Sequence, residues 1–217
     1  ASVDQAADIM LSLGQGALMA KFDIEHAYRL IPVHPDDHWL LGMQFEDATY
    51  VDTVLPFGLR SAPKLFNAVA DTLEWICRRR GIQHMLHYLD DFLIGAPHSP
   101  ECITNMNIVR SVFEELGVPI AEHKTVGPSS MIVFLGISID AESQMLRLPD
   151  DKLSDLKRLV ESWLERRTST VREVKSLVGK LENACKVVRP GRSFLRRMFD
   201  ILKGVKSNRR LIRLGAS

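Results

Sequence analysis

Residues 87–95 have the sequence HYLDDFLIG, in which two adjacent aspartates, Asp90 and Asp91, interrupt an apolar run that begins at Met85. The flanking Leu, Ile, Phe and Tyr residues, followed by Gly-Ala-Pro, predict two short buried strands with the aspartate pair at the turn between them. Two ionised carboxylates at such a turn are costly unless they bind a cation. Because the ligands are hard oxygens with no His or Cys cage nearby, the pattern favours Mg²⁺ or Mn²⁺ over zinc.

A third carboxylate lies upstream, at the end of another strand-like segment. Asp23 closes the run ALMAKFDI, residues 17–24, and is expected to reach an edge of the sheet. Two other pairs, Asp36-Asp37 and Asp150-Asp151, directly follow prolines and are typical of solvated loops. Three carboxylates on strand ends can hold two divalent ions roughly 3.5–4 Å apart, which can activate an attacking hydroxyl and stabilise the leaving oxygen in phosphoryl transfer.

Four motifs occur in an order that resembles the palm of a reverse transcriptase. They are KFDIEHAYRLIPVHPDDH (21–38), YVDTVLPFGLRSAPKLFNAVAD (50–71), HYLDDFLIG (87–95) and FLGISID (134–140). The resemblance covers nearly the whole chain and is closest to retrotransposons of the DIRS-like type, which carry a tyrosine recombinase. It implies an α+β fold: a polymerase palm of antiparallel sheet and packed helices, with a remnant of the fingers, over residues 1–148. A small helical thumb-like or connection region would follow over residues 149–217.

The resemblance also implies roles for individual residues. Asp23, Asp90 and Asp91 match the catalytic aspartates that bind the metal ions, and the backbone carbonyl of Ile24 matches a further metal ligand. Tyr28 matches the aromatic residue that lies under the sugar of the incoming nucleotide and rejects a 2′-hydroxyl, because its ring leaves no room for the extra oxygen. Without the surrounding motif, a plain core or interface tyrosine would be the first interpretation.

The segment LPFGLRSAP, residues 55–63, resembles the loop-to-helix element that packs against the templating base and the nucleotide. Phe57 and Gly58 are thereby placed in the nucleotide pocket. The residue types agree, since Gly58 permits close backbone approach and Pro63 suits the first turn of a helix. The apolar positions expected on that helix are Phe66, Val69, Leu73 and Ile76. For the following run Arg78-Arg79-Arg80, helix capping and solvated surface are favoured over nucleic-acid contact.

Lys124 matches a lysine of the family that can protonate the pyrophosphate leaving group, a step at which a general acid is physically reasonable. The adjacent His123 could serve instead, and a plain surface-loop lysine is the alternative interpretation. Further along, Phe134-Leu135-Gly136 resembles the hairpin that grips the primer terminus. An ordinary buried strand would have the same sequence, and the two interpretations are compatible.

The chain beyond Pro149 shows three amphipathic helical patterns, which predict a small bundle. Thr170 and Glu173 form a candidate capping box for the second helix. The apolar positions are Leu153, Leu156, Leu159, Val160, Trp163 and Leu164, then Val174, Leu177, Val178 and Leu181, then Phe194, Leu195, Met198, Phe199 and Leu202. By resemblance this region would track the minor groove of a duplex.

The charge of the chain is unevenly distributed although the net charge is only +1. Residues 186–217 contain ten of the 28 Lys and Arg residues and one acidic residue, Asp200, which leaves residues 1–185 with a net charge of −8. A basic end on an acidic body suggests contact with a phosphate backbone. A solvated basic helix is the alternative.

Composition agrees with this interpretation. A chain of 217 residues with 46% apolar content can bury a full core. The three cysteines follow no metal-ligand pattern and are typical of free thiols in a reducing compartment, and His84 and His87 are better explained as structural residues. With no apolar run of 18 residues and no signal-like N-terminus, the protein is expected to be intracellular, in the cytoplasm or nucleus, without a membrane partner.

Two functional hypotheses of different classes follow. The first is an RNA-directed DNA polymerase core, in which a primer 3′-hydroxyl on an RNA or DNA template attacks a dNTP with the help of Mg²⁺ or Mn²⁺. Because only 22 residues precede Asp23, most of the fingers are expected to be missing, which fits either a fragment of a longer protein or a shortened domain with another use. The second is a noncatalytic nucleic-acid-binding or protein-interaction module that kept the palm fold, since a fold alone does not establish activity. A two-metal nuclease or nucleotide cyclase would explain the carboxylates but not Tyr28 or residues 55–63.

Overall fold

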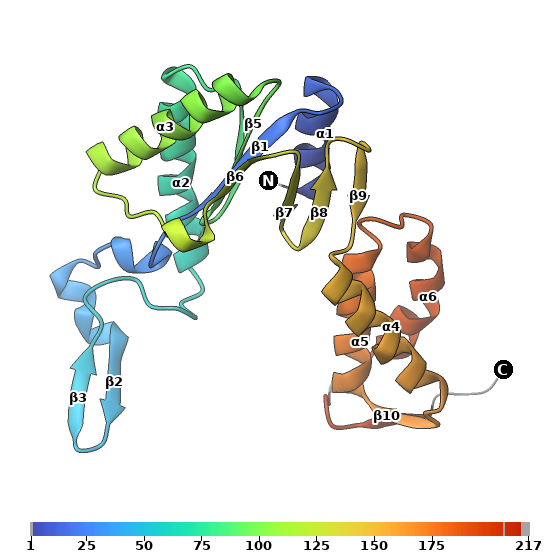
Figure 1. The fold of residues 1–217 in the computed structure, drawn as a ribbon. Helices are drawn as coiled ribbons and strands as arrows, with labels where there is room; N and C mark the ends of the chain where they lie inside the picture. Colours follow the sequence, from blue (N-terminus) through green and yellow to red (C-terminus); the bar gives the residue numbers. More distant parts are fainter. Residues whose placement is uncertain (1, 206, 214–217) are drawn as a thin grey trace. The chain divides into compact units, whose positions relative to one another are not determined.

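The computed structural model describes residues 2–205 and 207–213, which form two compact units. The first unit runs to Leu135 and also includes Ile139–Met145. The second contains Gly136–Ser138 and the chain from Leu146 onward. Figure 1 follows the chain through both units by colour.

A four-stranded antiparallel sheet in the order β4-β5-β1-β6 forms the centre of the first unit (Figure 1). Its strands are β1 (Leu18–Asp23), β4 (His84–Tyr88), β5 (Asp91–Ala96) and β6 (Val126–Ser129). The predicted hairpin is confirmed, but its turn consists of Leu89 and Asp90, so that Asp91 begins β5 instead of lying in the turn. Both strands bury most of their side chains, as their apolar sequences require.

Three helices surround this sheet: α1 (Val3–Leu13), α2 (Ala62–Arg79) and α3 (Ser99–Glu115). The main apolar core lies between the sheet face that carries Phe22 and Phe92 and the helices α2 and α3. Alternation along a strand turns Gly95 to the opposite face, where a Cβ atom would lie 2.7 Å from the side chain of Leu13 on α1. The missing side chain at this glycine therefore lets α1 pack directly on β5.

The helix predicted after residues 55–63 is confirmed as α2, with Pro63 in its first turn and Arg78 and Arg79 in its last. Phe66 and Leu73 are buried as predicted, but Val69 is exposed. The fully buried position on that stretch is Ala70. A small residue fits there because α2 also packs against α3.

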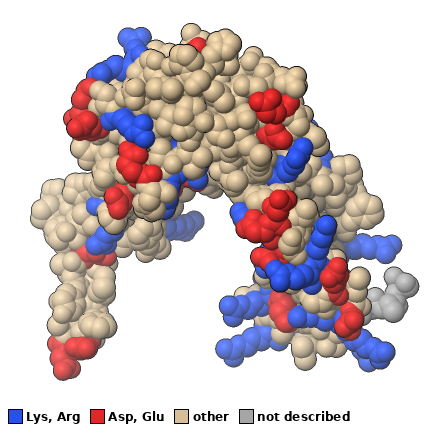
Figure 2. Space-filling view, viewed as in Figure 1, with Lys and Arg blue, Asp and Glu red and all other residues tan. Residues whose placement is uncertain are grey.

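The chain between β1 and α2 leaves the sheet and forms two short 3₁₀ helices and a hairpin. These elements are η1 (Ala27–Leu30), η2 (Pro35–Leu41), β2 (Gly42–Phe45) and β3 (Ala48–Val51). Every residue of β2 and β3 is exposed. In Figure 2 this hairpin is largely uncharged, with acidic residues at its tip, where Glu46 and Asp47 connect the strands.

A further 3₁₀ helix, η3 (Glu122–Lys124), leads into β6 and then into a three-stranded sheet in the order β7-β8-β9. The strands of this sheet are β7 (Met131–Phe134), β8 (Ile137–Asp140) and β9 (Met145–Arg147). Leu135 and Gly136, which connect β7 to β8, both have positive φ angles, of 48° and 78°. The segment predicted to be a hairpin therefore forms a tight two-residue turn.

The second unit contains the three predicted helices: α4 (Asp150–Leu164), α5 (Val171–Ala184) and α6 (Gly191–Leu202). The capping box is confirmed, since the Glu173 amide donates to the Thr170 hydroxyl and a Glu173 carboxylate oxygen accepts from the Thr170 amide at 2.8 Å. α4, however, has no buried residue, and Leu164 is 81% exposed. The apolar stripe predicted on α4 is therefore only partly covered.

A two-stranded sheet, β10 (Thr168–Thr170) and β11 (Leu211–Arg213), closes the second unit. Its strands are too short for their alternation to be visible in the sequence. Lys and Arg side chains project from this unit in Figure 2. Of the basic segment 186–217, Lys206 and residues 214–217 lie outside the described residues.

The three cysteines are free and buried. Among the helices of the described residues, none is both long enough and apolar enough to cross a membrane. The polar atoms of buried side chains within this part of the chain all have hydrogen-bond partners.

Gly127 sets how closely β6 approaches β1. A Cβ atom there would lie 2.6 Å from the carbonyl oxygen of Met19 and 2.7 Å from the Cα atom of Ala20, and the φ angle is +119°. Both contacts are with backbone, which cannot yield as a flexible side chain can. Because η3 leads directly into β6, this close fit also fixes the position of Lys124.

We predict that Gly127→Ala destabilises the first unit more than Gly14→Ala, its matched control. Gly14 also has a positive φ angle, of 90°, but a Cβ atom there would have no neighbour within 4 Å. Both substitutions incur backbone strain of ~1–3 kcal/mol; the clash at Gly127 adds ~1–3 kcal/mol. Urea unfolding of the two variants measures the difference, and equal loss of stability would show that β6 is not held closely on β1.

Candidate active site

One end of the central sheet brings together the three aspartates that the sequence singles out. Asp23 is the last residue of β1 and lies directly opposite Asp91, the first residue of β5. Asp90 occupies the adjoining turn, and its carbonyl oxygen accepts a hydrogen bond of 3.1 Å from the amide of Ile24. Backbone pairing, and not side-chain attraction, therefore holds these carboxylates near one another.

The backbone around this end is strained. Leu89, in the turn before Asp90, has a φ angle of +54°, and His26 and Ala27, just after β1, have φ angles of +61° and +21°. Non-glycine residues rarely adopt such angles, and two-residue turns of this kind normally use Gly or Asn. Leu89 is held there by packing against the apolar core. Strain of this kind clusters at functional sites.

A cavity of about 460 Å³ lies beside the aspartates. Its size falls in the range of small-molecule sites, which is ~300–1,000 Å³. Seven of the residues singled out in the sequence line it: Asp23, Ile24, Tyr28, Phe57, Asp90, His123 and Lys124. Asp91 and Gly58 are adjacent to lining residues but do not line the cavity themselves.

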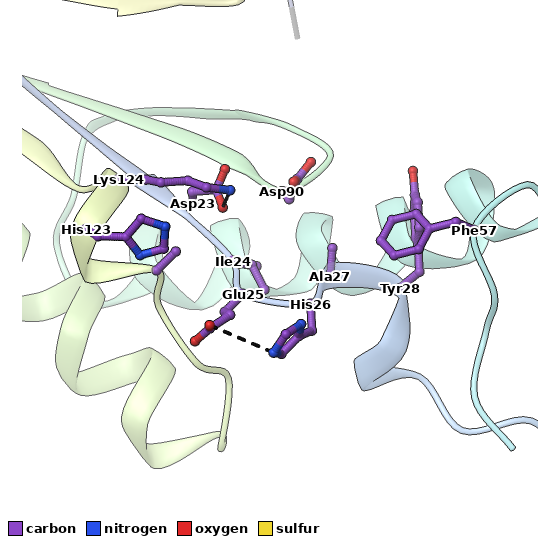
Figure 3. A pocket seen from close by; sticks show the side chains of 11 residues that line it. Asp23, Ile24, Glu25, His26, Ala27, Tyr28, Phe57, Asp90, His123 and Lys124 are labelled. Carbon is purple, nitrogen blue, oxygen red and sulfur yellow. Dashed lines mark hydrogen bonds and ion pairs between the residues drawn. The ribbon is translucent and has the colours of Figure 1, made fainter. Parts of the chain in front are cut away.

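Two lysines neutralise two of the three carboxylates. Lys124 Nζ donates to Asp23 Oδ1 at 2.8 Å, and Lys21 Nζ lies 3.5 Å from Asp91 Oδ1. Figure 3 shows Lys124 pointing at Asp23, with the Asp90 side chain across the same space. Sequence reasoning missed Lys21, although alternation along a strand places it on the same face as Asp23, two residues away.

The pKa values of two ionisable groups in the cavity, Asp90 and Lys124, are raised for different reasons. Burial, followed by the negative charges of Asp23 and Asp91, raises the pKa of the Asp90 carboxyl above its ordinary value. The hydrogen bond to Asp23 raises the pKa of the Lys124 ammonium. Asp90 is thus the carboxylate at this end of the sheet whose charge is least compensated.

The donor atoms suit a hard divalent cation. Asp23 and Asp90 present carboxylate oxygens to the cavity (Figure 3), and Ile24 also lines it. Carboxylate oxygens are ligands of the type that Mg²⁺ and Mn²⁺ prefer. Within the described residues, no three or more His, Cys, Asp and Glu side chains are already grouped closely enough to hold a metal ion. Asp91 is directed to Lys21 and would have to leave it to join such a group.

The other end of the cavity is aromatic. The Tyr28 ring packs edge-on against Phe57 and Phe66, with centroids 5.4 and 5.5 Å apart. Burial and the charge of Asp90 raise the pKa of the Tyr28 hydroxyl, which therefore stays protonated at neutral pH. Phe57 is 69% exposed, and a Cβ atom at the neighbouring Gly58 would meet nothing within 4 Å. This wall is thus open to a ligand on the Phe57 side.

Four further residues line the cavity that sequence reasoning missed: Glu25, His26, Ala27 and Ala121. Glu25 and His26 form an ion pair of 3.8 Å between exposed side chains, seen in Figure 3. His123 lies beside Lys124 on η3, so both residues considered for the general acid are at the cavity. Of these two residues, only Lys124 contacts an aspartate. Glu25 and His26 lie within the motif of residues 21–38, but that motif assigned them no role of their own.

Comparison with known proteins identifies the family of this chain. The family model for reverse transcriptase (RNA-dependent DNA polymerase) matches residues 2–139, well over half of the chain. The Pro-Pol polyprotein of feline foamy virus is 27% identical over 177 residues, which are 81% of this chain and 14% of that polyprotein. The chain belongs to the reverse transcriptase family, and it spans a small part of the length of the viral relative that it matches.

Solved structures of similar fold come from the same group of viruses. A foamy viral protease–reverse transcriptase in complex with double-stranded DNA superposes with a TM-score of 0.71 at 19% identity, over 92% of this chain and 34% of that one. The foamy viral enzyme in complex with an RNA/DNA hybrid gives a TM-score of 0.66 at 18% identity, over 93% of this chain and 26% of that one. The predicted α+β fold with antiparallel sheets and packed helices is confirmed.

We predict that Asp23→Asn lowers the pKa of Lys124 towards its ordinary value, because the hydrogen bond from the ammonium to a carboxylate is the main cause of its elevation. A lysine with a raised folded-state pKa stabilises the fold at pH below its unfolded pKa, and this stabilisation disappears as the pH rises through the folded-state value. NMR titration of the Lys124 side chain measures the shift. Asp150→Asn, in the second unit, is the control, and an unchanged Lys124 pKa in Asp23→Asn would contradict the ion pair.

Proposed function

We propose that this chain is the catalytic core of an RNA-directed DNA polymerase that transfers a nucleotide from a dNTP to a primer 3′-hydroxyl. The observation that carries the proposal is the two-ended cavity, with Asp23, Asp90 and Lys124 at one end and Tyr28 and Phe57 at the other. A deoxynucleoside triphosphate has the same division, with a charged phosphate chain and an apolar sugar face. Membership of the reverse transcriptase family supports this assignment.

The carboxylates would hold the metal ions of the reaction. Asp23 and Asp90, with the Ile24 carbonyl and with Asp91 once it leaves Lys21, are the ligands that we assign to Mg²⁺ or Mn²⁺. When bound, such ions lower the pKa of the attacking hydroxyl and neutralise charge on the leaving phosphate. The carboxylates' own contribution would be to hold those ions at this end of the sheet.

Lys124 and Tyr28 act on different parts of the substrate. The primer 3′-hydroxyl gives up its proton to solvent as its oxygen bonds to the α-phosphorus. The bond from the α-phosphorus to the pyrophosphate oxygen breaks at the same time, and the Lys124 ammonium donates one proton to that leaving oxygen. Its raised pKa keeps the proton on Nζ until Asp23 is released. Tyr28, braced by Phe57 and Phe66, excludes a 2′-hydroxyl from the sugar position.

The whole protein is proposed to belong to a retroelement of the DIRS-like type. This assignment rests on the four motifs quoted from the sequence. RNA or DNA template with primer is the partner that we assign, consistent with the duplexes named for the foamy viral structures. The basic segment 186–217 is the second site of contact with phosphates, and its contribution should weaken as salt concentration rises.

A noncatalytic nucleic-acid-binding module is the second candidate. The observation that favours it is the pairing of Asp23 with Lys124 and of Asp91 with Lys21, because carboxylates neutralised by lysine repel a nucleic-acid backbone less than free ones do. The two candidates make opposite predictions for the loss of a carboxylate. Removing the charge of Asp90 should abolish synthesis by a polymerase, whereas a binding module should retain or gain affinity.

We predict that Asp90→Asn reduces primer extension on an RNA template by at least ~100-fold, because loss of a metal ligand removes several kcal/mol of transition-state stabilisation. The matched control is Asp36→Asn, which removes a carboxylate from the exposed Asp36-Asp37 pair. Extension with dNTPs and Mg²⁺ is measured alongside duplex binding. Synthesis that persists in Asp90→Asn would contradict the polymerase mechanism, and binding without synthesis in the wild-type chain would favour the noncatalytic module.

We also predict that Tyr28→Ala relaxes sugar selectivity. Without the ring, the space for a 2′-hydroxyl opens, and the preference for dNTPs over rNTPs should fall by roughly 10-fold or more, the scale on which a pocket rejects a small added group. Tyr28→Phe keeps the ring and its contacts with Phe57 and Phe66, and should keep the selectivity. Single-nucleotide incorporation of dNTP and rNTP by the three proteins measures the ratio, and equal ratios would rule out the gate.

A further inference from the structure

A second cluster of charged groups lies away from the candidate active site, where α2 meets the edge strand β4. We propose that His87, held by Glu74 on α2, which Arg78 holds in turn, is a positioning residue that anchors β4 and thereby fixes the turn that carries Asp90 and leads into Asp91. The inference deepens the proposed polymerase function and rests on it for its consequence in catalysis. The anchoring itself is a property of the fold.

His87 is confined on several sides. Its side chain is 6% exposed, its Nδ1 lies 2.7 Å from Glu74 Oε2, and its Nε2 lies 3.4 Å from Asp71 Oδ1. The imidazole also stacks on Phe92 of β5, with centroids 5.2 Å apart and planes at 28°. A rotation of the ring would break all of these contacts at once. The His87 side chain therefore holds β4 in a fixed position against α2.

Arg78 extends the same anchor along the backbone of β4. Its Nε donates to Glu74 Oε1 at 2.8 Å and its Nη1 to the carbonyl oxygen of Gln83 at 2.7 Å. Its Nη2 donates to the carbonyl oxygen of Met85. β4 is an edge strand, so its outward backbone groups have no partner on a neighbouring strand. The Arg78 guanidinium supplies the hydrogen bonds that such a strand would give.

The anchor is close enough to the aspartate turn to control it. Only Tyr88 and Leu89 separate His87 from Asp90, and Tyr88 pairs with Asp91 to close the hairpin. Because Leu89 holds a strained left-handed conformation, the turn needs rigid flanks to keep it. A β4 strand that moved freely on α2 would let the turn relax and displace the carboxylates.

Helix α2 also reaches the opposite end of the cavity. Phe66, in its first turns, packs edge-on against Tyr28, whereas Glu74 and Arg78 lie two or more turns further along. One rigid helix thus holds both the aromatic wall and the strand that leads to the aspartates. The cluster in this way sets the distance between the part of the site that binds the sugar and the part that carries the charge.

The charges around His87 support an ionic anchor. Burial would raise the pKa of Glu74, but hydrogen bonds from His87 and Arg78 outweigh it and hold that pKa below its usual value, so the carboxylate is ionised at neutral pH. Asp71 faces the imidazole from the same helix. From α1, Gln5 and Asp8 line the adjoining cleft of about 370 Å³.

The test uses His87→Phe, which keeps a ring to stack on Phe92 and removes the hydrogen bond to Glu74 together with the contact to Asp71. We expect the amides of Leu89, Asp90 and Asp91 to exchange with solvent at least ~10-fold faster, the scale of one lost charge-assisted hydrogen bond, while the amides of β1 are unchanged. In primer extension, kcat should fall at least ~10-fold with KM for dNTP nearly constant, because the aromatic wall remains.

The matched control is Glu115→Gln, which breaks the exposed Arg80–Glu115 pair of 2.6 Å at the same end of α2. It should alter neither hydrogen exchange at the turn nor kcat. Glu74→Gln is the milder variant, because its amide oxygen can still accept from His87. Glu74→Gln should therefore keep most of the protection of the turn amides from exchange that His87→Phe loses. If His87→Phe does not fold, Glu74→Gln replaces it in both measurements, and a smaller acceleration of exchange at the turn is then expected.

The outcomes separate the anchor from the polymerase function. The anchor proposal would be overturned if the turn amides of His87→Phe exchanged at the wild-type rate. It would also be overturned if exchange became faster evenly over the whole sheet. Faster exchange confined to the turn with unchanged kcat would overturn its role in positioning the aspartates. If the wild-type chain makes no DNA, the polymerase proposal fails, and the exchange measurement still decides whether His87 anchors the strand.

Discussion

The repulsion among three carboxylates at one end of the sheet is the constraint on which the rest of this structure depends. Asp23 and Asp91 face each other across β1 and β5, and Asp90 adjoins them with a raised pKa. Antiparallel pairing along six residues of each strand supplies the force that opposes this repulsion. The two lysine pairs reduce its cost, and the charge left on Asp90 is available to a cation.

The architecture around the aspartates serves to keep them in place. Gly127 lets β6 approach β1 closely and thereby places Lys124 at Asp23. On the other side of the hairpin, α2 contacts both Tyr28 and the edge strand β4. The cavity is lined by the end of β1, the turn between β4 and β5, and the 3₁₀ helices η1 and η3. These segments are held in place by the central sheet and by α2, so that the strained turn at Leu89 is flanked by ordered elements.

Much of the fold could be predicted because its signals are local. The apolar run broken by Asp90 and Asp91 predicts a hairpin, Pro63 marks the start of α2, and Thr170 with Glu173 marks the start of α5. The signals failed where burial depends on distant neighbours. Val69 is apolar but lies on the exposed side of α2, and α4 has an apolar stripe that its own unit covers only in part.

The sequence by itself determined the family, the hairpin and the residue types of the site, because motifs and alternation are properties of neighbouring residues. Only the tertiary structure decided which of those residues share a cavity. It placed Asp23, Asp90 and Lys124 together, directed Asp91 to Lys21, and joined His87 to Glu74. These contacts join residues 13 to 101 positions apart, and their partners are chosen by strand pairing and helix packing, which no local pattern records.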